Sequence, residues 1–420
     1  MYQKTTLDNG LRVITATMPH TRSASISIFV GAGSRYETEK QAGVSHFIEH
    51  LLFKGTPRRT TSRDISVAIE GVGGIINAGT DKELTVYWCK TAQAHFPLAL
   101  DVLSDILLHS KFDPHDIDSE RRVIIEEIHM VKDSPSQLVN MLIDGLLWPD
   151  HPLGRDIAGD KDSVAGTSRE MMLDYLDCQY LPSNTVVSIA GALKHREMIN
   201  AVNEALGGWA DRQPLPGYKE YKEGAFPRLK IECKDTEQAH LCLGLNGLPL
   251  LHPQRFVLDL LNVVLGEGMS SRLFTEIRDR LGLAYSIHSY VDHFLDTGAI
   301  TIYAGVEPKN LPVAIKAILE QLSLLKESVP EDELVKAKEL TKGRLLLRME
   351  DSRNVAGWMG GQEILAGKIL SVDQVTSIID AITAEELGRL ANELLVAGQL
   401  RLAVVGPVAE DEPLDKLLKL

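Results

Sequence analysis

A similarity between the two halves of the sequence limits which folds are possible. The segment PLALDVL, which begins at Pro97, has apolar residues at helical spacing, and so has PVAIKAI, which begins at Pro312. A second proline, Pro114 in one half and Pro330 in the other, opens a further helical pattern in each half. The two offsets, 215 and 216 residues, are nearly equal, which is typical of a duplicated unit. A chance resemblance between two helical hairpins is the alternative.

The point of division lies near the middle of the chain. Between residues 207 and 227, prolines and glycines alternate with charged residues, a composition typical of linkers. We therefore expect a first half at residues 1–213, a linker at 214–227 and a second half at 228–420. Periodicity predicts that the first half mixes strands and helices, with strands at 11–17, 23–30 and 75–89 and helices at 43–53, 65–70, 97–108 and 116–131.

Charge and composition exclude several classes of partner. The net charge of −14 argues against nucleic acid and against anionic membrane surfaces, because both need basic side chains. An acidic cavity that attracts basic peptides and an ordinary acidic surface both remain open. The N-terminal residues MYQKTTLDNGLRV show no apolar signal core, and no apolar run approaches about 18 residues. We expect a cytoplasmic protein with four reduced cysteines: Cys89, Cys178, Cys233 and Cys242.

The segment 43–53 contains HFIEH, which places two histidines one helical turn apart. On a helix, His46 and His50 share one face, and their nitrogens can bind one Zn²⁺ at about 2.0–2.1 Å. Glu49 flanks that face, where it can act as general base on a metal-bound water. The surrounding residues are apolar, and burying three polar groups without partners costs several kcal/mol. A metal site is therefore favoured over two surface histidines beside a solvated glutamate.

A catalytic zinc needs a third protein ligand, and the helix predicted at 116–131 offers one. Its periodicity places Glu120 and Glu127 on one face, together with the apolar Val123, Ile124 and Val131. We expect Glu127 to bind the metal and Glu120 to orient a histidine or balance charge. Glu126 lies about 100° away and is expected to face solvent. The alternative is a helix with two exposed glutamates that bury only their apolar stems.

These residues resemble the pitrilysin/insulinase family of metallopeptidases, and above all the single-chain bacterial relatives of the mitochondrial processing peptidase. The family carries H-x-x-E-H, the inverse of H-E-x-x-H, followed by a distant glutamate. Here 76 residues lie between His50 and Glu127. The resemblance implies an α+β fold of two related halves, each an antiparallel sheet packed with helices. It also implies one Zn²⁺ per chain, bound by His46, His50 and Glu127, with Glu49 as catalytic base.

The second half contains RDRLGLAY, from Arg278 to Tyr285, which is similar to the arginine–tyrosine element of the family. The resemblance implies that Tyr285 hydrogen-bonds the oxyanion and that Arg278 orients it or the substrate. From the residues alone, a salt-bridged helical arginine and a tyrosine in the core of a strand are the simpler interpretation.

The segment INAGT at 76–80 resembles the edge strand that lies beside the metal helix in the family. The resemblance implies that a substrate adds to this edge as an extra strand, along Asn77, Ala78, Gly79 and Thr80, so that its backbone provides affinity. A turn built on asparagine, alanine and glycine is the alternative.

The resemblance also implies an assembly. Family chambers contain four halves and one chain supplies two, so we expect a homodimer in which Arg278 and Tyr285 serve the zinc of the partner. A heterodimer with an inactive relative would give the same geometry. The expected function is a zinc metalloendopeptidase that cleaves unfolded peptides or short protein segments in an enclosed chamber. A non-catalytic peptide-binding or assembly subunit, and a zinc enzyme acting on a non-peptide amide, are the alternatives.

Overall fold

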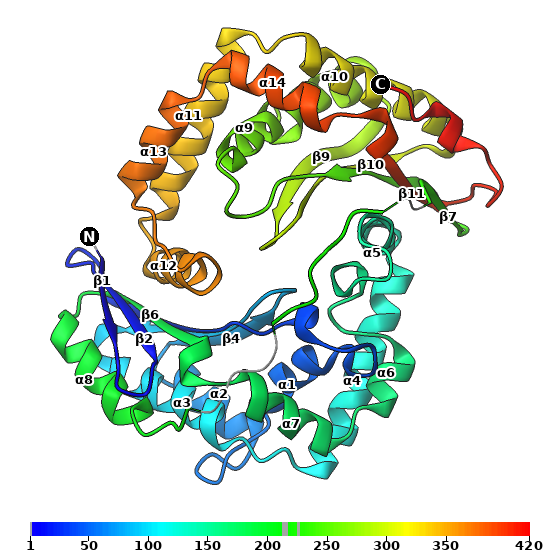
Figure 1. Ribbon diagram of the computed structural model, residues 1–420. Coiled ribbons are helices and arrows are strands. Elements are labelled where there is room, and N and C mark those ends of the chain that lie inside the picture. The colour runs from blue at the N-terminus through cyan, green and yellow to red at the C-terminus, as the bar shows by residue number, and fades with distance from the viewer. Residues whose placement is uncertain (1, 212–216, 225–226) are drawn as a thin grey trace. The chain divides into compact units, whose positions relative to one another are not determined.

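The computed structural model describes residues 2–211, 217–224 and 227–420. Contacts within the chain divide it into two compact units (Figure 1). Unit 1 contains residues 1–128, 156–219 and 346–371, and unit 2 contains residues 129–155, 220–345 and 372–420. Within the described residues, no helix is both long enough and apolar enough to cross a membrane.

Unit 1 is built on a six-stranded sheet with the order β1-β2-β6-β3-β5-β4. Neighbouring strands are antiparallel except β2 and β6, which are parallel. The strand β4 forms one edge, and among the described strands it pairs with β5 alone. The strands are β1 (Tyr2–Thr6), β2 (Arg12–Thr17), β3 (Ser23–Val30), β4 (Ile75–Thr80), β5 (Thr85–Ala92) and β6 (Thr185–Gly191).

Helices cover both faces of this sheet. One face packs into the main core with seven helices: α1 (Val44–Leu52), α2 (Ser62–Glu70), α3 (Phe96–His109), α4 (Pro114–Asp133), α6 (Lys161–Gly166), α7 (Arg169–Gln179) and α8 (His195–Leu206). The opposite face packs against α12 (Ser352–Ala366), through a smaller core that includes Phe29, Ala356 and Met359. Figure 1 shows α12, in orange, close to the sheet that contains β2 and β6.

Unit 2 repeats this plan with a five-stranded sheet of order β7-β11-β8-β10-β9, in which β7 and β11 are parallel. Its strands are β7 (Leu229–Cys233), β8 (Ala239–Asn246), β9 (Ala284–His293), β10 (Gly298–Val306) and β11 (Arg401–Gly406). Its helices are α5 (Pro135–Leu147), α9 (Arg255–Gly266), the π-helix η6 (Phe274–Arg280), α10 (Leu311–Glu327), α11 (Glu331–Arg348), α13 (Val372–Ala381) and α14 (Ala384–Leu394).

The predicted fold class, two related α+β halves, is confirmed. The strands correspond in order, since β2-β6-β3-β5-β4 in unit 1 matches β7-β11-β8-β10-β9 in unit 2. Each sheet is antiparallel except for one parallel pair. The sequence patterns missed β1, whose burial is slight because it forms the outer edge of its sheet.

Two helices do not pack in the unit that the predicted division of the sequence gives them. The helix α5 lies in the first half of the sequence but packs on β8 and β11 in unit 2, whereas α12 lies in the second half and packs in unit 1. The boundary between units also falls inside the expected linker, after Lys219. Residues 214–216 and 225–226 of that linker lie outside the described residues. The division of the sequence at 1–213 and 228–420 stays a prediction. In the folded protein, each half of the sequence contributes one helix to the unit built mainly from the other half.

Candidate metal centre

The helix α1 begins at a tightly enclosed glycine. Gly43 has φ of 91°, and a Cβ at this position would lie 2.3 Å from the carbonyl oxygen of Ala158. The buried carboxylate of Glu37 accepts hydrogen bonds from the N–H groups of Gly43 and Ser45, each at 2.8 Å. A carboxylate here satisfies N–H groups that a helix start leaves unpaired, and it complements the helix dipole. These contacts fix the start of α1 and thereby the direction in which its side chains project.

Two histidines and one glutamate converge in unit 1. The Nε2 atoms of His46 and His50, both on α1, are 3.2 Å apart. Oε2 of Glu127, on α4, lies 3.8 Å from the first of these nitrogens and 3.7 Å from the second. One ligand atom from each residue lies within 4.8 Å of the others, and no second group of this kind is found in the part of the chain that the structure describes. Two imidazole nitrogens with one carboxylate oxygen are a donor set suited to zinc, so the residues present fit that ion.

The protonation state of His46 suits a metal ligand. Its Nδ1 is buried and has no hydrogen-bond partner among the described residues. Burial, and then the neighbouring His50, lower the pKa of His46 to about 4. The imidazole is therefore neutral near pH 7, and its Nε2 lone pair is available to a metal ion.

The ring of His50 contacts the carboxylate of Glu120, which also pairs with the ammonium of Lys54. Oε2 of Glu120 lies 3.0 Å from Nδ1 of His50, and Oε1 lies 2.5 Å from Nζ of Lys54. Glu120 is 6% exposed, so this ion pair replaces lost hydration. A histidine that donates its second N–H to a carboxylate has a fixed ring orientation and binds metal more strongly. Glu120 thus lies where the sequence predicted, and Lys54 is a partner that the sequence pattern did not reveal.

Glu49 projects from α1 beside the two histidines, and its carboxylate accepts a hydrogen bond from the hydroxyl of Thr80, the last residue of β4. Burial raises the pKa of Glu49 above its usual range, and the hydrogen bond from Thr80 opposes that rise. A raised pKa suits a group that must accept and later release a proton near neutral pH. Thr80 was predicted only as part of the substrate strand, so its contact with Glu49 is new.

The face of α4 differs in one respect from the predicted one. The buried stripe runs through Ile117, Ile124 and Ile128, and Val123 is 42% exposed. The prediction that Val123 belongs to the buried face is therefore wrong, because the stripe is centred on Ile124 and leaves its neighbour at the margin. Glu127 lies at that margin too, with a side chain that is 40% exposed. A ligand carboxylate at the edge of the core can reach α1 while solvent retains access to the site.

The segment Asn77–Thr80 lies in the edge strand β4, with Ala78 opposite Tyr87 and Gly79 opposite Val86 of β5. Nothing lies within 4 Å of where a Cβ on Gly79 would stand. The side-chain oxygen of Asn77 accepts the N–H of Ala78 at 2.8 Å, so it is engaged locally. The predicted edge strand is present, and its role toward a substrate stays a prediction.

Arg278 and Tyr285 are neighbours within unit 2. The guanidinium carbon of Arg278, on η6, lies 4.8 Å from the ring centroid of Tyr285 and 4.6 Å from that of Phe274. Tyr285, near the start of β9, is 78% exposed, so it is not a residue of the strand core. An exposed tyrosine hydroxyl beside a guanidinium can form hydrogen bonds to a bound group. Among the described residues, no contact links Tyr285 to the proposed zinc ligands. Its predicted role stays a prediction.

Two related sheet-and-helix units, with H-x-x-E-H on a helix of the first, define the class of inverted-motif metallopeptidases. The sequence model described as insulinase (peptidase family M16) matches residues 12–161, and the one described as peptidase M16 inactive domain matches residues 167–341. The chain belongs to peptidase family M16, the insulinase family.

Relatives are similar over nearly the whole chain. YmxG of Bacillus subtilis, described as an uncharacterized zinc protease, is 35% identical over 97% of this chain and 98% of its own length. An uncharacterized zinc protease of Mycobacterium leprae is 37% identical over 99% of this chain and 94% of its own. The crystal structure of a protease from Helicobacter pylori superposes with a TM-score of 0.92 at 23% identity, covering 97% of this chain and 99% of that one. This last likeness concerns the fold.

Proposed function

We propose that the protein is a zinc-dependent endopeptidase that cleaves unfolded peptides or short protein segments, with one Zn²⁺ per chain. The observation that carries this function is the convergence of His46, His50 and Glu127, with Glu49 close enough to His50 and Glu127 for their charges to affect its pKa. The descriptions of the relatives as zinc proteases support it.

Different residues of the chain bind the metal, transfer the proton and position these groups. Zinc bound by His46, His50 and Glu127 would supply Lewis acidity, which acidifies a water molecule and polarises the scissile carbonyl. Glu49 takes the proton of that water and later delivers it to the leaving amine. The hydroxyl of Thr80 holds the carboxylate of Glu49 in place, and Glu120 holds the ring of His50.

The edge strand β4 is the proposed binding site for the substrate backbone. A peptide that pairs with the outer edge of β4, along residues 77–80, is bound by main-chain hydrogen bonds that do not depend on its sequence. Since Thr80 also contacts Glu49, this edge ends at the catalytic base. A chain that binds in extended form must be unfolded, which accounts for the proposed preference for unfolded peptides.

A dimer completes the proposal. We expect Arg278 and Tyr285 to stabilise the oxyanion at the zinc of a partner chain, inside a chamber built by two chains. The contact of Arg278 with the exposed ring of Tyr285 supports a joint role for this pair. A homodimer is the simplest assembly, and a heterodimer with an inactive relative would supply the same groups.

Metal content and one variant test the catalytic proposal. Metal analysis should find about one zinc per chain, and Glu49→Gln should keep that zinc while cleavage of an unstructured fluorogenic peptide falls at least about 10²-fold. Glu126→Gln, which changes an exposed carboxylate beside Glu127 on α4, is the matched control and should cleave normally. Absence of zinc, or undiminished cleavage by Glu49→Gln, would contradict the proposal.

Mixing two inactive variants tests the shared site. Chains carrying Glu49→Gln lack the base, and chains carrying Arg278→Ala lack the oxyanion partner. If the groups cross between chains, mixed dimers contain one complete site and recover part of the activity. No recovery, with subunit exchange demonstrated by labelled chains, would refute crossing while leaving the peptidase proposal intact.

A non-catalytic subunit of the same family is the other candidate. The description "inactive domain" belongs to the match at residues 167–341, which contains none of the proposed zinc ligands. The intact set of His46, Glu49, His50 and Glu127 therefore favours the enzyme. Peptide binding without cleavage in the zinc-loaded protein would support the subunit, and cleavage only of non-peptide amides would support a different metalloenzyme.

A further inference from the structure

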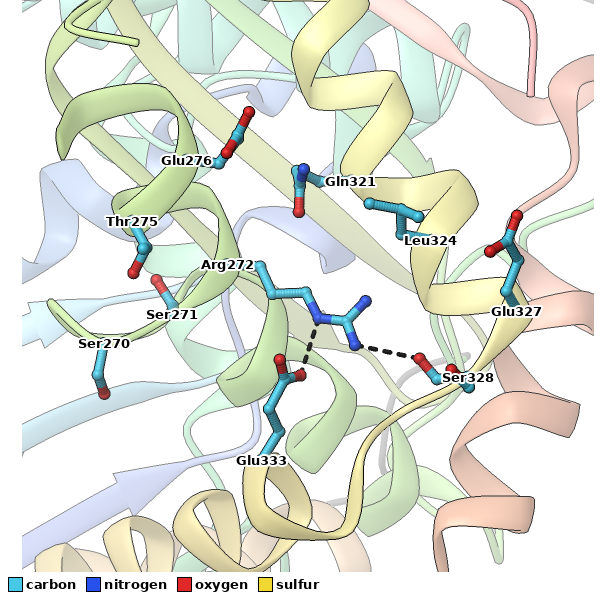
Figure 2. Close-up of a pocket in the computed structure, with 10 residues that line it drawn as sticks. All are labelled: Ser270, Ser271, Arg272, Thr275, Glu276, Gln321, Leu324, Glu327, Ser328 and Glu333. Carbon is cyan, nitrogen blue, oxygen red and sulfur yellow. Dashed lines mark hydrogen bonds and ion pairs between the residues drawn. The ribbon is translucent and has the colours of Figure 1, made fainter. Parts of the chain in front are cut away.

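An arginine joins neighbouring helices in each unit. In unit 2, Arg272 precedes η6 and donates to Oε2 of Glu333 on α11 at 2.8 Å (Figure 2). It also donates to the carbonyl oxygen of Ser328, just after α10, at 3.1 Å. The packing of these helices accounts for both bonds. The arginine of unit 1, Arg121, has a further consequence, because it lies on α4, the helix that carries Glu127.

Arg121 closes the C-terminal end of α6. Its Nη1 donates to the carbonyl oxygens of Val164 and, at 3.2 Å, of Ala165, and its Nη2 donates to that of Thr167 at 2.9 Å. The last carbonyl groups of a helix have no partner within the helix, and a cation at this end complements the helix dipole. A planar guanidinium with several fixed donors matches such a group of oxygens better than the ammonium of a lysine does.

The same guanidinium also contacts α1. Its central carbon lies 5.5 Å from the ring centroid of Phe47, a fully buried residue that follows His46 in the sequence. A cation at this distance from an aromatic ring is attracted to it, and the side chain of Arg121 is only 20% exposed, so solvent screens the attraction little. Arg121 therefore joins α4 to α6 and to α1, and the proposed zinc ligands lie on two of these three helices.

The loop that leads into α6 packs closely on the start of α1. A Cβ on Gly43 would lie 2.3 Å from the carbonyl oxygen of Ala158, and a Cβ on Gly159 would lie 2.4 Å from that of Ala42. Gly159 also has φ of 76°, a conformation that favours glycine. The segment 158–167 thus contacts the start of α1 at one end and the arginine of α4 at the other.

The placement of α4 determines where its ligand carboxylate lies. Glu127 is at the margin of the core, with a side chain that is 40% exposed. Four of the 20 residues of α4 are buried: Ile117, Glu120, Ile124 and Ile128. A long helix with so few buried side chains depends on its polar contacts for a fixed position. Ligand groups must be held to within about 0.5 Å, so a small movement of α4 weakens metal binding.

We infer, on the basis of the proposed zinc site, that Arg121 is a positioning residue of the metal centre. It holds α4 against α6 and α1, so that Glu127 meets His46 and His50. Its side chain acts through the helices that it joins, and zinc affinity depends on the several donors of the guanidinium.

Zinc affinity of the full-length protein, measured by competition with a chromophoric chelator, tests this role. Arg121→Met keeps an apolar stem and removes the donors, so zinc binding should weaken about tenfold or more. Arg121→Lys keeps the charge without the planar fork and should restore only part of the affinity. Arg122→Met is the matched control. Arg122 is an exposed neighbour that donates to the carbonyl oxygen of Asp118 within α4 at 3.3 Å, and this variant should bind zinc normally.

Gly360→Ala separates positioning from a general loss of stability. A Cβ at Gly360 would lie 2.3 Å from Cε2 of Phe29, so this variant should have a lower thermal midpoint. Its zinc affinity and the visible absorption spectrum of its Co²⁺-loaded form should match those of the wild type. Arg121→Met should change both, because ligand geometry determines that spectrum. Equal zinc affinity in Arg121→Met and the wild type, or an equal loss in Gly360→Ala, would overturn the inference.

Hydrogen exchange of the full-length protein in the presence of a chelator tests the junction without zinc. Amides of residues 161–167 should exchange faster in Arg121→Met than in the wild type or in Arg122→Met. Unchanged exchange would overturn the role of Arg121. A wild-type protein that binds zinc and cleaves no peptide would refute the proposed peptidase and leave this role intact. A peptidase whose zinc affinity does not depend on Arg121 would do the reverse.

Discussion

At the scale of single residues, Glu120 links a proposed zinc ligand to a cation. Its two oxygens contact Nδ1 of His50 and Nζ of Lys54. In Glu120→Ala, the ring of His50 loses its acceptor and the ammonium of Lys54 loses its partner. We expect zinc affinity, measured by competition with a chromophoric chelator, to fall about 10–100-fold. Glu120→Gln keeps an oxygen near His50, so its zinc affinity should fall less. The zinc affinity of Glu126→Ala should be unchanged. Equal affinity in Glu120→Ala would show that this contact does not support the metal.

Glu37 acts on the same helix through its backbone. In Glu37→Ala, the N–H groups of Gly43 and Ser45 lose their acceptor inside the core. Each unpaired buried donor costs about 1–3 kcal/mol, so we expect unit 1 to lose about 2–6 kcal/mol of unfolding free energy, seen as a lower thermal midpoint in calorimetry. Glu39→Ala, an exposed glutamate two residues further on, is the control. Equal thermal midpoints for Glu37→Ala and Glu39→Ala would contradict the proposed role of Glu37.

The sequence predicted the residues of the candidate site that follow a helical period and missed those that do not. His46 and His50 are four residues apart, and Glu120 and Glu127 are seven apart, so periodicity alone brings each pair to one side of its helix. Lys54 lies just beyond the end of α1, and Glu37 reaches the start of that helix from a preceding loop. Their partners depend on how the chain turns between elements, which no local pattern specifies.

At the scale of elements, α12 approaches the sheet of unit 1 through a glycine. A Cβ at Gly360 would lie 2.3 Å from Cε2 of Phe29 and 2.9 Å from Cβ of Ser188, whereas a Cβ at Gly361 would meet nothing within 4 Å. Gly360→Ala should therefore move the helix away from β3 and β6 and cost about 1–3 kcal/mol of stability. Gly361→Ala should be neutral or stabilising by up to about 1 kcal/mol, because alanine favours helix.

Thermal unfolding of these two variants checks the packing of α12. Both substitutions add one methyl group to adjacent positions of one helix, so helix propensity affects them alike and cancels in the comparison. The difference between their midpoints then measures the contact with Phe29 and Ser188. If the two variants unfold at the same temperature, α12 does not pack on the sheet as closely as described.

At the scale of the whole molecule, the duplication was visible in the sequence and the exchange of helices was not. The offset between Pro97 and Pro312 indicates that the halves are alike, and the common strand order agrees. The helices α5 and α12 occupy corresponding places in the two halves, since each follows the second long helix of its half. Both have apolar faces that fit a sheet. Likeness between repeats cannot tell which copy of a helix packs on which sheet, because both pairings satisfy the same pattern.

The exchange predicts that neither half of the sequence is stable alone. A fragment of residues 1–213 lacks α12, so Phe29, Val186 and Ala190 on the second face of its sheet lose their cover. A fragment of residues 228–420 lacks α5, so Cys242, Ala403 and Val405 lose theirs. We expect each fragment, expressed by itself, to aggregate or to unfold without cooperativity, because its exposed face is apolar. Co-expression should yield a soluble complex with one copy of each fragment.

Light scattering after size-exclusion chromatography measures that stoichiometry. The matched control is a chain cut between residues 213 and 228 after folding, which should keep its thermal midpoint since both helices are already in place. Introducing Gly360→Leu into the second fragment should prevent assembly, because a large side chain cannot fit where a Cβ already lies 2.3 Å from Phe29. Two fragments that each fold cooperatively as monomers would show that the helices do not hold the units as the packing indicates.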